Sequence, residues 1–206
     1  MTKIKICGIT NKRDAIDAAG LMPDMMGFVF YNGSKRYVEP KIVRDIANEL
    51  PPAVIKVGVF VDMDKNKVLE IAGECALDIL QFHGDETPDY CASFKDSCKV
   101  IKAFGIKDSG ILEGINDYNT DFYILDAYSA KEKGGTGKSF DWKIVESFEF
   151  LRPVILSGGL TPLNVRDAIE KLSPYGVDVS SGVEASPGKK DLLLMKKFVE
   201  NVRRAQ

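Results

Sequence analysis

The chain has 206 residues, of which 45% are hydrophobic and 28% charged, and its formal net charge is −2. This balance is typical of a globular protein with a large core, and we expect residues 1–206 to form a single domain. The near-neutral charge argues against nucleic acid as a partner. No apolar run approaches the ~20 residues that a membrane span needs, so we expect no membrane partner either.

Four cysteines without a CxxC pair and a single histidine, His83, complete the composition. A disulfide framework is not expected at this size, and no cysteine stands at zinc-ligand spacing from His83. The amino terminus shows no signal-peptide pattern. We therefore expect a cytoplasmic protein without a metal site.

The first predicted strand, residues 3–7, is the segment around which the chain is organised. Its isoleucines would face one side and its lysines the other. Cys7 stands at the carboxyl end of this strand, before a helix predicted over residues 12–19. Because α/β proteins keep their active sites at this position, the thiol is a candidate functional group.

Strand-like and helix-like segments alternate along the rest of the chain. We predict strands over residues 3–7, 26–30, 54–61, 79–82, 100–104, 122–126, 154–156 and 177–179. We predict helices over residues 12–19, 40–50, 65–75, 88–94, 109–115, 142–148, 163–172 and 192–203. Eight units of about 26 residues favour the α/β class with a single (β/α)8 TIM barrel over a doubly wound open sheet of five or six strands.

The segments after the seventh and eighth strands carry a possible anion site. The first contains Gly158 and Gly159, and the second contains Ser180, Ser181 and Gly182. Glycines let backbone N–H groups approach an anion, and the start of the following helix adds partial positive charge. Either segment alone could be an ordinary tight turn. Both together, where such barrels commonly bind phosphate, favour a phosphate site.

The longest segment between predicted elements covers residues 127–141 and includes a glycine-rich stretch, residues 134–139. This stretch ends like a P-loop, but the first glycine of that motif would have to stand at Glu132. A mobile loop or lid over the site fits better than a nucleotide-binding loop.

Cys7 and Asp126, the residue that ends the sixth strand, are candidates for an acid–base pair. A thiol becomes a useful base when its pKa is lowered, and a phosphate site or a helix dipole can modulate it. A desolvated carboxyl group can stay protonated and act as an acid. Local pattern alone favours the structural alternatives, which are a small buried apolar residue for Cys7 and a strand-end cap or salt-bridge partner for Asp126. We expect the remaining cysteines to be structural: Cys75, Cys91 and Cys98.

Three further polar residues lie in or after predicted strands and are candidates for substrate contacts. The planar guanidinium of Arg36 suits a carboxylate, although a solvated surface charge is the alternative. His83 is as consistent with a structural hydrogen bond as with catalysis. Asp178 could orient a substrate or hold the loop that contains Ser180.

The motifs in combination resemble phosphoribosylanthranilate isomerase. The resemblance runs from the first strand to the loop after the eighth, and rests on KICGIT at 5–10, GFVF at 27–30, SKRYV at 34–38, VGVFV at 57–61, LQFHG at 80–84, LDA at 125–127, GGTG at 134–137, FDW at 140–142, SGGL at 157–160, NV at 164–165 and DVSSGVE at 178–184. Two departures are Phe82, where the family more often has leucine, and Lys35, where proline is frequent.

The resemblance implies a barrel enzyme of tryptophan biosynthesis, an aldose–ketose isomerase that catalyses an Amadori rearrangement of N-(5-phosphoribosyl)anthranilate. It implies Asp126 as general acid, Cys7 as general base and Arg36 as the anthranilate carboxylate contact. It also implies a small-molecule phosphoribosyl partner and no cofactor, because the substrate's own iminium accepts the electrons. Oligomeric state, monomer or homodimer, stays open.

Two alternatives accompany this interpretation. The related aminoaldose isomerase of histidine biosynthesis performs the same chemistry on a substrate with two phosphates, but this sequence shows one phosphate site and no internal duplication. A non-catalytic phosphosugar-binding barrel would need the phosphate loops without Cys7 and Asp126.

Overall fold

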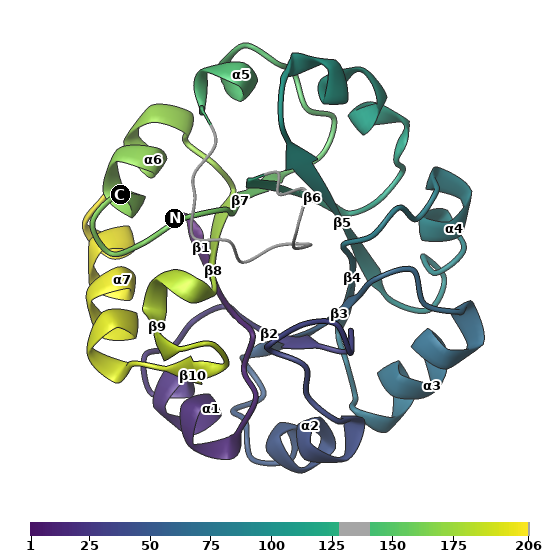
Figure 1. Ribbon diagram of the computed structural model, residues 1–206, viewed down its shortest axis with the longest axis vertical. Coiled ribbons are helices and arrows are strands. Elements are labelled where there is room, and N and C mark those ends of the chain that lie inside the picture. Colours follow the sequence, from purple (N-terminus) through teal and green to yellow (C-terminus); the bar gives the residue numbers. More distant parts are fainter. Residues whose placement is uncertain (128–140, 206) are drawn as a thin grey trace.

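The computed structural model describes residues 1–127 and 141–205. Their centre is a closed barrel of parallel strands, each hydrogen-bonded to its neighbours in chain order (Figure 1). The strands are β1 (Lys3–Cys7), β2 (Met25–Val29), β3 (Ile55–Phe60), β4 (Ile79–Phe82), β5 (Lys99–Ile106), β6 (Phe122–Ala127), β7 (Val154–Leu156) and β8 (Gly176–Val179). The predicted (β/α)8 class is confirmed, and each predicted strand is present with ends shifted by up to two residues.

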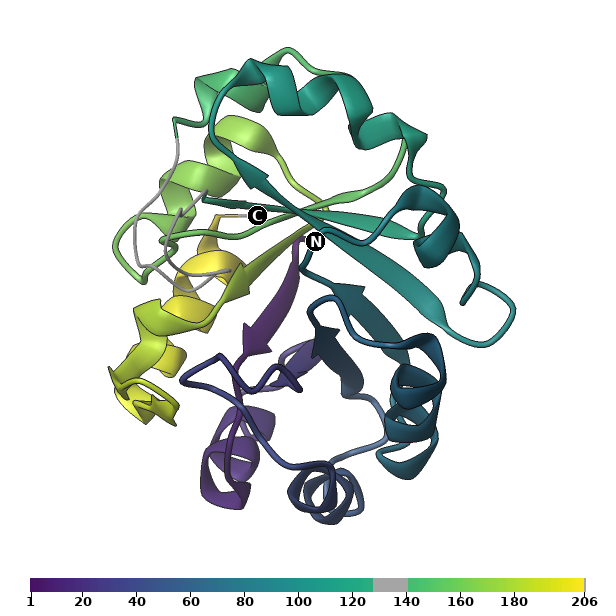
Figure 2. The same cartoon turned by 45° about the vertical axis from the view of Figure 1, so that its right-hand side comes forward.

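Helices form a ring outside the strands, as Figures 1 and 2 show. They are α1 (Lys12–Ala19), α2 (Pro40–Ala47), α3 (Lys65–Glu74), α4 (Pro88–Ala92), α5 (Lys143–Glu146), α6 (Val165–Leu172) and α7 (Leu192–Arg204). Local capping explains several starts: the side chains of Asn11, Asp64 and Thr87 accept hydrogen bonds from the first-turn backbone of α1, α3 and α4. None of the helices in the described residues has the length and apolar composition needed to cross a membrane.

The connection between β5 and β6 differs from the prediction. The α-helix expected over residues 109–115 is a 3-10 helix, η1 (Ser109–Asp117). Gly110 and Gly114 lie within it, and glycine is the costliest ordinary residue in an α-helix. The helices expected over 142–148 and 163–172 are also shorter, because α5 covers only Lys143–Glu146 and α6 begins at Val165.

The two faces of the strands build two cores. Outward side chains such as Ile4 and Ile6 of β1 pack in the cluster that contains the helix residues. A smaller apolar cluster fills the barrel itself, with Met25, Val57, Ile79, Ile101, Ala103, Ile124 and Ile155. The lysine side of β1 faces inward, as the alternation predicts, because the Lys5 side chain is fully buried and contacts Asp178 of β8.

A hairpin that the sequence analysis missed follows β8. A short 3-10 helix, η2 (Ser181–Val183), leads into β9 (Glu184–Ser186), which pairs antiparallel with β10 (Lys189–Lys190). Figures 1 and 2 show this hairpin beside α7. The Lys190 backbone N–H donates to Asp14 of α1 over 2.7 Å, which anchors the hairpin to the helical ring.

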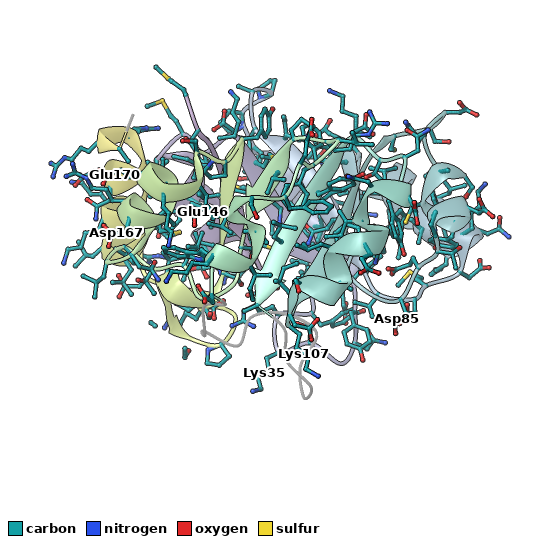
Figure 3. All side chains as sticks on the ribbon, turned by 90° about the horizontal axis from the view of Figure 1, so that it is seen from above. Lys35, Asp85, Lys107, Glu146, Asp167 and Glu170 are labelled. Atoms are coloured by element: carbon teal, nitrogen blue, oxygen red, sulfur yellow. The ribbon has the colours of Figure 1, made fainter. Side chains whose placement is uncertain are left out.

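All segments that follow a strand emerge at one end of the barrel. Lys35, Asp85 and Lys107, which come after β2, β4 and β5, lie together along one edge of the molecule in the side view of Figure 3. Parallel strands require this arrangement, because their carboxyl ends point the same way. The candidate residues therefore converge on this end, which we call the mouth.

Candidate active site

A pocket at the mouth is lined by most of the predicted site residues. They come from different elements and face the same space: Cys7, Arg36, His83, Asp126, Asp178 and Ser180. Apolar side chains from β2 and β3, including Val29 and Val59, complete the walls. Residues from both ends of the chain thus share one site, as expected for the mouth of a closed barrel.

Cys7 ends β1 with its side chain buried in the pocket wall, where it is 7% exposed. Gly27 lies directly opposite on β2, and a Cβ atom there would lie 2.5 Å from the Cys7 Sγ. Gly8 follows with a φ of +76°, a conformation that L side chains rarely adopt, so the chain turns away at once. The thiol therefore occupies space that only glycine leaves.

The electrostatic setting of the thiol differs from the expectation of a lowered pKa. Burial raises the pKa of Cys7 above its ordinary value. The positive charges of Lys5 and Lys190 oppose this rise, whereas the Asp178 carboxylate adds to it. Two buried lysines, which the sequence analysis did not assign, thus oppose the effect of desolvation on the pKa of the thiol.

Asp126 is positioned by two neighbours at the end of β6. Its Oδ1 accepts from the Ala127 backbone N–H over 2.7 Å, and its Oδ2 lies 3.2 Å from the His83 Nε2. The Gln81 amide nitrogen lies 3.1 Å from the His83 Nδ1. With Gln81 as donor, the imidazole carries its proton on Nε2 and donates it to Asp126.

Asp178 is held from within the barrel. Its Oδ1 accepts from the Lys5 ammonium over 3.1 Å, and its Oδ2 accepts from the Ser157 hydroxyl over 3.4 Å. Lys5 is fully buried and Asp178 is 5% exposed, so this ion pair lies away from solvent. The pair places a carboxylate beside the thiol in the same wall of the pocket.

Arg36 is oriented by the hairpin rather than by its own loop. Its Nε and Nη2 donate to the two carboxylate oxygens of Glu184 over 2.9 and 2.8 Å. Lys190 donates to the same carboxylate and to the Ser180 carbonyl, over 2.9 and 3.1 Å. Burial favours the neutral form of Glu184, but the hydrogen bond from Arg36 and the charge of Lys190 outweigh it and lower its pKa. Arg36 is therefore an ordered, largely buried cation and not a solvated surface charge.

The two glycine-rich loops lie against each other. Gly158 and Gly159 have φ values of +78° and +66°. A Cβ atom on Gly182 would lie 1.9 Å from the Leu160 carbonyl oxygen, so the loop after β8 packs directly on the loop after β7. Among the described residues, the buried Ser180 hydroxyl has no hydrogen-bond partner. The helix expected from residue 163 begins at Val165, after a turn in which Asn164 accepts from the Thr161 backbone N–H and donates to the Gly159 carbonyl.

The remaining cysteines lie away from the pocket, as expected. All four cysteines carry free thiols. Burial raises the pKa of Cys75 to about 11 and of Cys91 to about 12, so these thiols are unreactive at neutral pH. Burial also raises the pKa of Cys98. The proposed lid over 127–141 and the stretch 134–139 lie outside the described residues, apart from the ends Ala127 and Asp141.

Five residues that support the site were not assigned from the sequence: Lys5, Gln81, Ser157, Glu184 and Lys190. Lys5 and Gln81 could have been found by the period-two rule, because each stands two residues before an assigned residue on the same strand face. Glu184 and Lys190 could not, because no local pattern predicts the hairpin register that brings them to Arg36. No group of three or more His, Cys, Asp or Glu side chains in the described ranges could hold a metal ion.

The fold and the pocket define a (β/α)8-barrel protein with a thiol, a carboxyl group and two glycine-rich loops at one mouth. A family model described as N-(5'-phosphoribosyl)anthranilate (PRA) isomerase matches residues 4–201. The chain belongs to this family.

Individual relatives agree along the whole chain. An N-(5'-phosphoribosyl)anthranilate isomerase of Desulforudis audaxviator is 47% identical over 207 residues, covering 100% of both chains. The phosphoribosylanthranilate isomerase structure from Thermotoga maritima has a TM-score of 0.93 and 42% identity, covering 99% of this chain and 100% of that one. A further isomerase structure, in complex with reduced 1-(o-carboxyphenylamino)-1-deoxyribulose 5-phosphate, has a TM-score of 0.90 and 41% identity, with the same coverage.

We predict that Gly27→Ala lowers turnover of phosphoribosylanthranilate about 100-fold while the barrel stays folded. The new Cβ would lie 2.5 Å from the Cys7 Sγ, closer than real Cβ contacts, so the sulfur must move. Displacing a reacting group by about 1 Å typically costs this much. The measurement is kcat/KM, with circular dichroism to establish folding.

Gly73→Ala is the matched control, because a Cβ there meets nothing within 4 Å. It should leave kcat/KM unchanged. Unchanged kcat/KM in Gly27→Ala as well would show that the thiol position is not critical.

Proposed function

We propose that Cys7 and Asp126 carry out the family reaction in this chain, the isomerisation of N-(5'-phosphoribosyl)anthranilate to 1-(2-carboxyphenylamino)-1-deoxyribulose 5-phosphate in tryptophan biosynthesis. The observation that carries this proposal is the convergence of the thiol and the carboxyl group on one pocket from separate strands. The family match from residue 4 to 201 supports it, and favours it over the histidine-pathway substrate and over a non-catalytic barrel.

The reaction needs one acid and one base. Asp126, as general acid, protonates the ribose ring oxygen, and the ring opens to a protonated Schiff base. Cys7, as thiolate, then removes the proton from C2, and the electron pair of that C–H bond neutralises the iminium to form an enolamine. Tautomerisation gives the ketone. The substrate's own iminium accepts the electrons, so no added cofactor is needed in this scheme.

The surroundings of each group suit its role. His83 at Oδ2 and the Ala127 N–H at Oδ1 fix the orientation of the Asp126 carboxyl group toward the pocket. The Cys7 sulfur lies in a wall that excludes water, where a proton transfer is not diverted to solvent. Asp178, next to Cys7, is placed to accept hydrogen bonds from the sugar hydroxyls.

The phosphate and the anthranilate carboxylate, at the two ends of the substrate, are assigned to the glycine-rich loops and to Arg36. The phosphate lies against Gly158, Gly159, Ser180, Ser181 and Gly182, which supply backbone N–H groups and the buried Ser180 hydroxyl. The anthranilate carboxylate pairs with the Arg36 guanidinium, whose position Glu184 sets. The contact between the two glycine-rich loops supports a single phosphate position.

We place the protein in the cytoplasm, because a thiol that acts as a base must stay reduced and all four cysteines carry free thiols. Residues 1–206 act as a single catalytic domain in this proposal.

Cys7→Ala and Asp126→Asn should each reduce kcat by about 10²–10⁴-fold, the usual contribution of an acid or base, with the fold intact. The assay follows the loss of fluorescence of freshly generated phosphoribosylanthranilate, beside the native chain. Cys98→Ala, which removes a thiol outside the pocket, is the control and should match the native rate. Near-native kcat in either site variant would remove the corresponding residue from its role.

Arg36→Ala should raise KM roughly 10- to 100-fold, with a smaller change in kcat, because it removes a charge-assisted hydrogen bond made throughout the reaction. Glu184 keeps Lys190 as its partner in this variant, which limits the structural damage. Arg44→Ala, at a half-exposed arginine of α2, should leave KM unchanged. A native KM in Arg36→Ala would contradict the carboxylate contact.

Exposed apolar residues favour a homodimer over a monomer. Met1, Met22, Leu151 and Tyr175 are 106%, 70%, 65% and 40% exposed, and each lies before a strand, at the end of the barrel opposite the mouth. We expect light scattering to give twice the 22.7 kDa chain mass, and Leu151→Asp to give the chain mass. Leu163→Asp, at the mouth end, should keep the dimer mass. A native mass of one chain would contradict this prediction.

A further inference from the structure

Lys5 is a charged group that the proposed reaction does not use. Its side chain has 0% solvent exposure, and its Nζ lies 3.1 Å from the Asp178 Oδ1. Burying an ion pair costs several kcal/mol per ion before the attraction offsets it, and apolar replacements are often equally stable. Stability alone therefore does not account for a lysine at this position.

The Lys5 side chain lies on the same face of β1 as the proposed base. Lys5 and Cys7 stand two residues apart on β1, and so face the same side of the strand. The positive charge of Lys5 acts to lower the pKa of the Cys7 thiol, while the Lys5 Nζ donates to Asp178 over 3.1 Å. Gly27, opposite the thiol, leaves the space that the sulfur occupies on this face.

The charged groups around the thiol come from several elements. Lys5 comes from β1, Asp178 from β8 and Lys190 from β10. Arg36 shares the Glu184 carboxylate with Lys190. His83, which follows β4, and Asp126 of β6 face the same pocket. The two cations that favour the thiolate are Lys5 and Lys190.

Burial lowers the pKa of Lys190 overall, despite its bond to Glu184. Burial acts to lower the pKa of Lys5 as well. The negative charges of Asp178 and Cys7 outweigh this effect, so the pKa of Lys5 is raised. Lys5 therefore remains an ammonium at neutral pH. A group that stabilises a thiolate by charge must be positively charged.

We propose that Lys5 is a positioning residue for the reaction, whose buried ammonium, on the same face of β1 as Cys7, stabilises by its charge the thiolate that removes the substrate proton. This inference rests on Cys7 as the proposed base. Lys5 keeps its own protons throughout: the sulfur gains the C2 proton, and the negative charge of the thiolate passes to the substrate, where it neutralises the iminium.

The test titrates the Cys7 thiol directly, without turnover. Iodoacetamide alkylation of Cys7 is followed against pH by peptide mass spectrometry, which separates Cys7 from Cys75, Cys91 and Cys98. Lys5→Met should move the alkylation midpoint to higher pH and slow alkylation at pH 7 about tenfold or more, because it removes the cation beside the thiolate. In the activity assay, kcat should fall with the same shift of its ascending limb, whereas KM changes little.

Lys5→Met also leaves the Asp178 carboxylate buried without its partner, so a second background is needed. Asp178→Asn alone should move the midpoint to lower pH, because it removes a negative charge that raises the pKa of Cys7. Adding Lys5→Met to Asp178→Asn should again raise the midpoint. If Lys5 acts only by neutralising Asp178, the second step will have no effect, and the proposal fails.

Lys102→Met is the matched control for loss of a buried lysine. Lys102 is 2% exposed and pairs with Glu86 over 2.9 Å, on the outer side of β5 and away from Cys7. It should lower stability without moving the alkylation midpoint. An equal shift in Lys102→Met, or no shift in Lys5→Met, would overturn the proposal. Failure of Cys7→Ala to reduce turnover would refute the base assignment, and the alkylation data would still report whether Lys5 stabilises the thiolate.

Discussion

Alternation of side chains along parallel strands sets the positions of the site residues that the strands carry. In β1 it sends the isoleucines to the helical side, and Lys5 and Cys7 to the barrel interior. The register of β1 on β8 then pairs Lys5 with Asp178. A shift of one residue would exchange the faces of the strand, placing a lysine in the apolar outer core. The cost of an unpaired buried charge therefore holds the register that also delivers the thiol to the mouth.

Along the barrel axis, the apolar residues that stabilise the barrel and the polar residues of the pocket occupy separate layers. The middle of the barrel is filled by apolar side chains such as Val57, Ile101 and Ile155. The pocket that contains Cys7 and Asp126 begins where the strands end. Burial of each large apolar side chain contributes about 1.5–3 kcal/mol, so this layer is a rigid floor beneath the polar one. The polar residues of the pocket can therefore vary with the reaction, because the apolar layer beneath them is stabilised by its own packing.

The mouth concentrates buried cations, and each has a carboxylate partner. Lys5 pairs with Asp178, and both Arg36 and Lys190 pair with Glu184. Shared carboxylates keep these cations charged without solvent. They also set the balance at Cys7, where desolvation favours the neutral thiol and the lysines favour the thiolate. The hairpin β9–β10 matters for this reason, since it carries both Glu184 and Lys190.

Short-range rules were enough to predict the order of strands and helices, the barrel class and six of the residues that line the pocket. These rules are period-two alternation in β1, proline and capping residues before helices such as α4, and the convergence of strand ends in a parallel barrel. The motifs that resemble the family are local as well. For that reason the residue pattern made Cys7, Arg36 and Asp126 candidates, and the family resemblance implied their roles.

Which charges meet depends instead on long-range contacts. The bidentate bond from Arg36 to Glu184 joins residues 148 positions apart, and the bond from Lys5 to Asp178 spans 173. These pairings require barrel closure and the hairpin after β8, and neither leaves a local pattern. The direction of the Cys7 pKa has the same origin, because it is a difference between burial and opposing charges contributed by β1, β8 and β10. The balance of these contributions cannot be predicted from residues that are neighbours in the sequence.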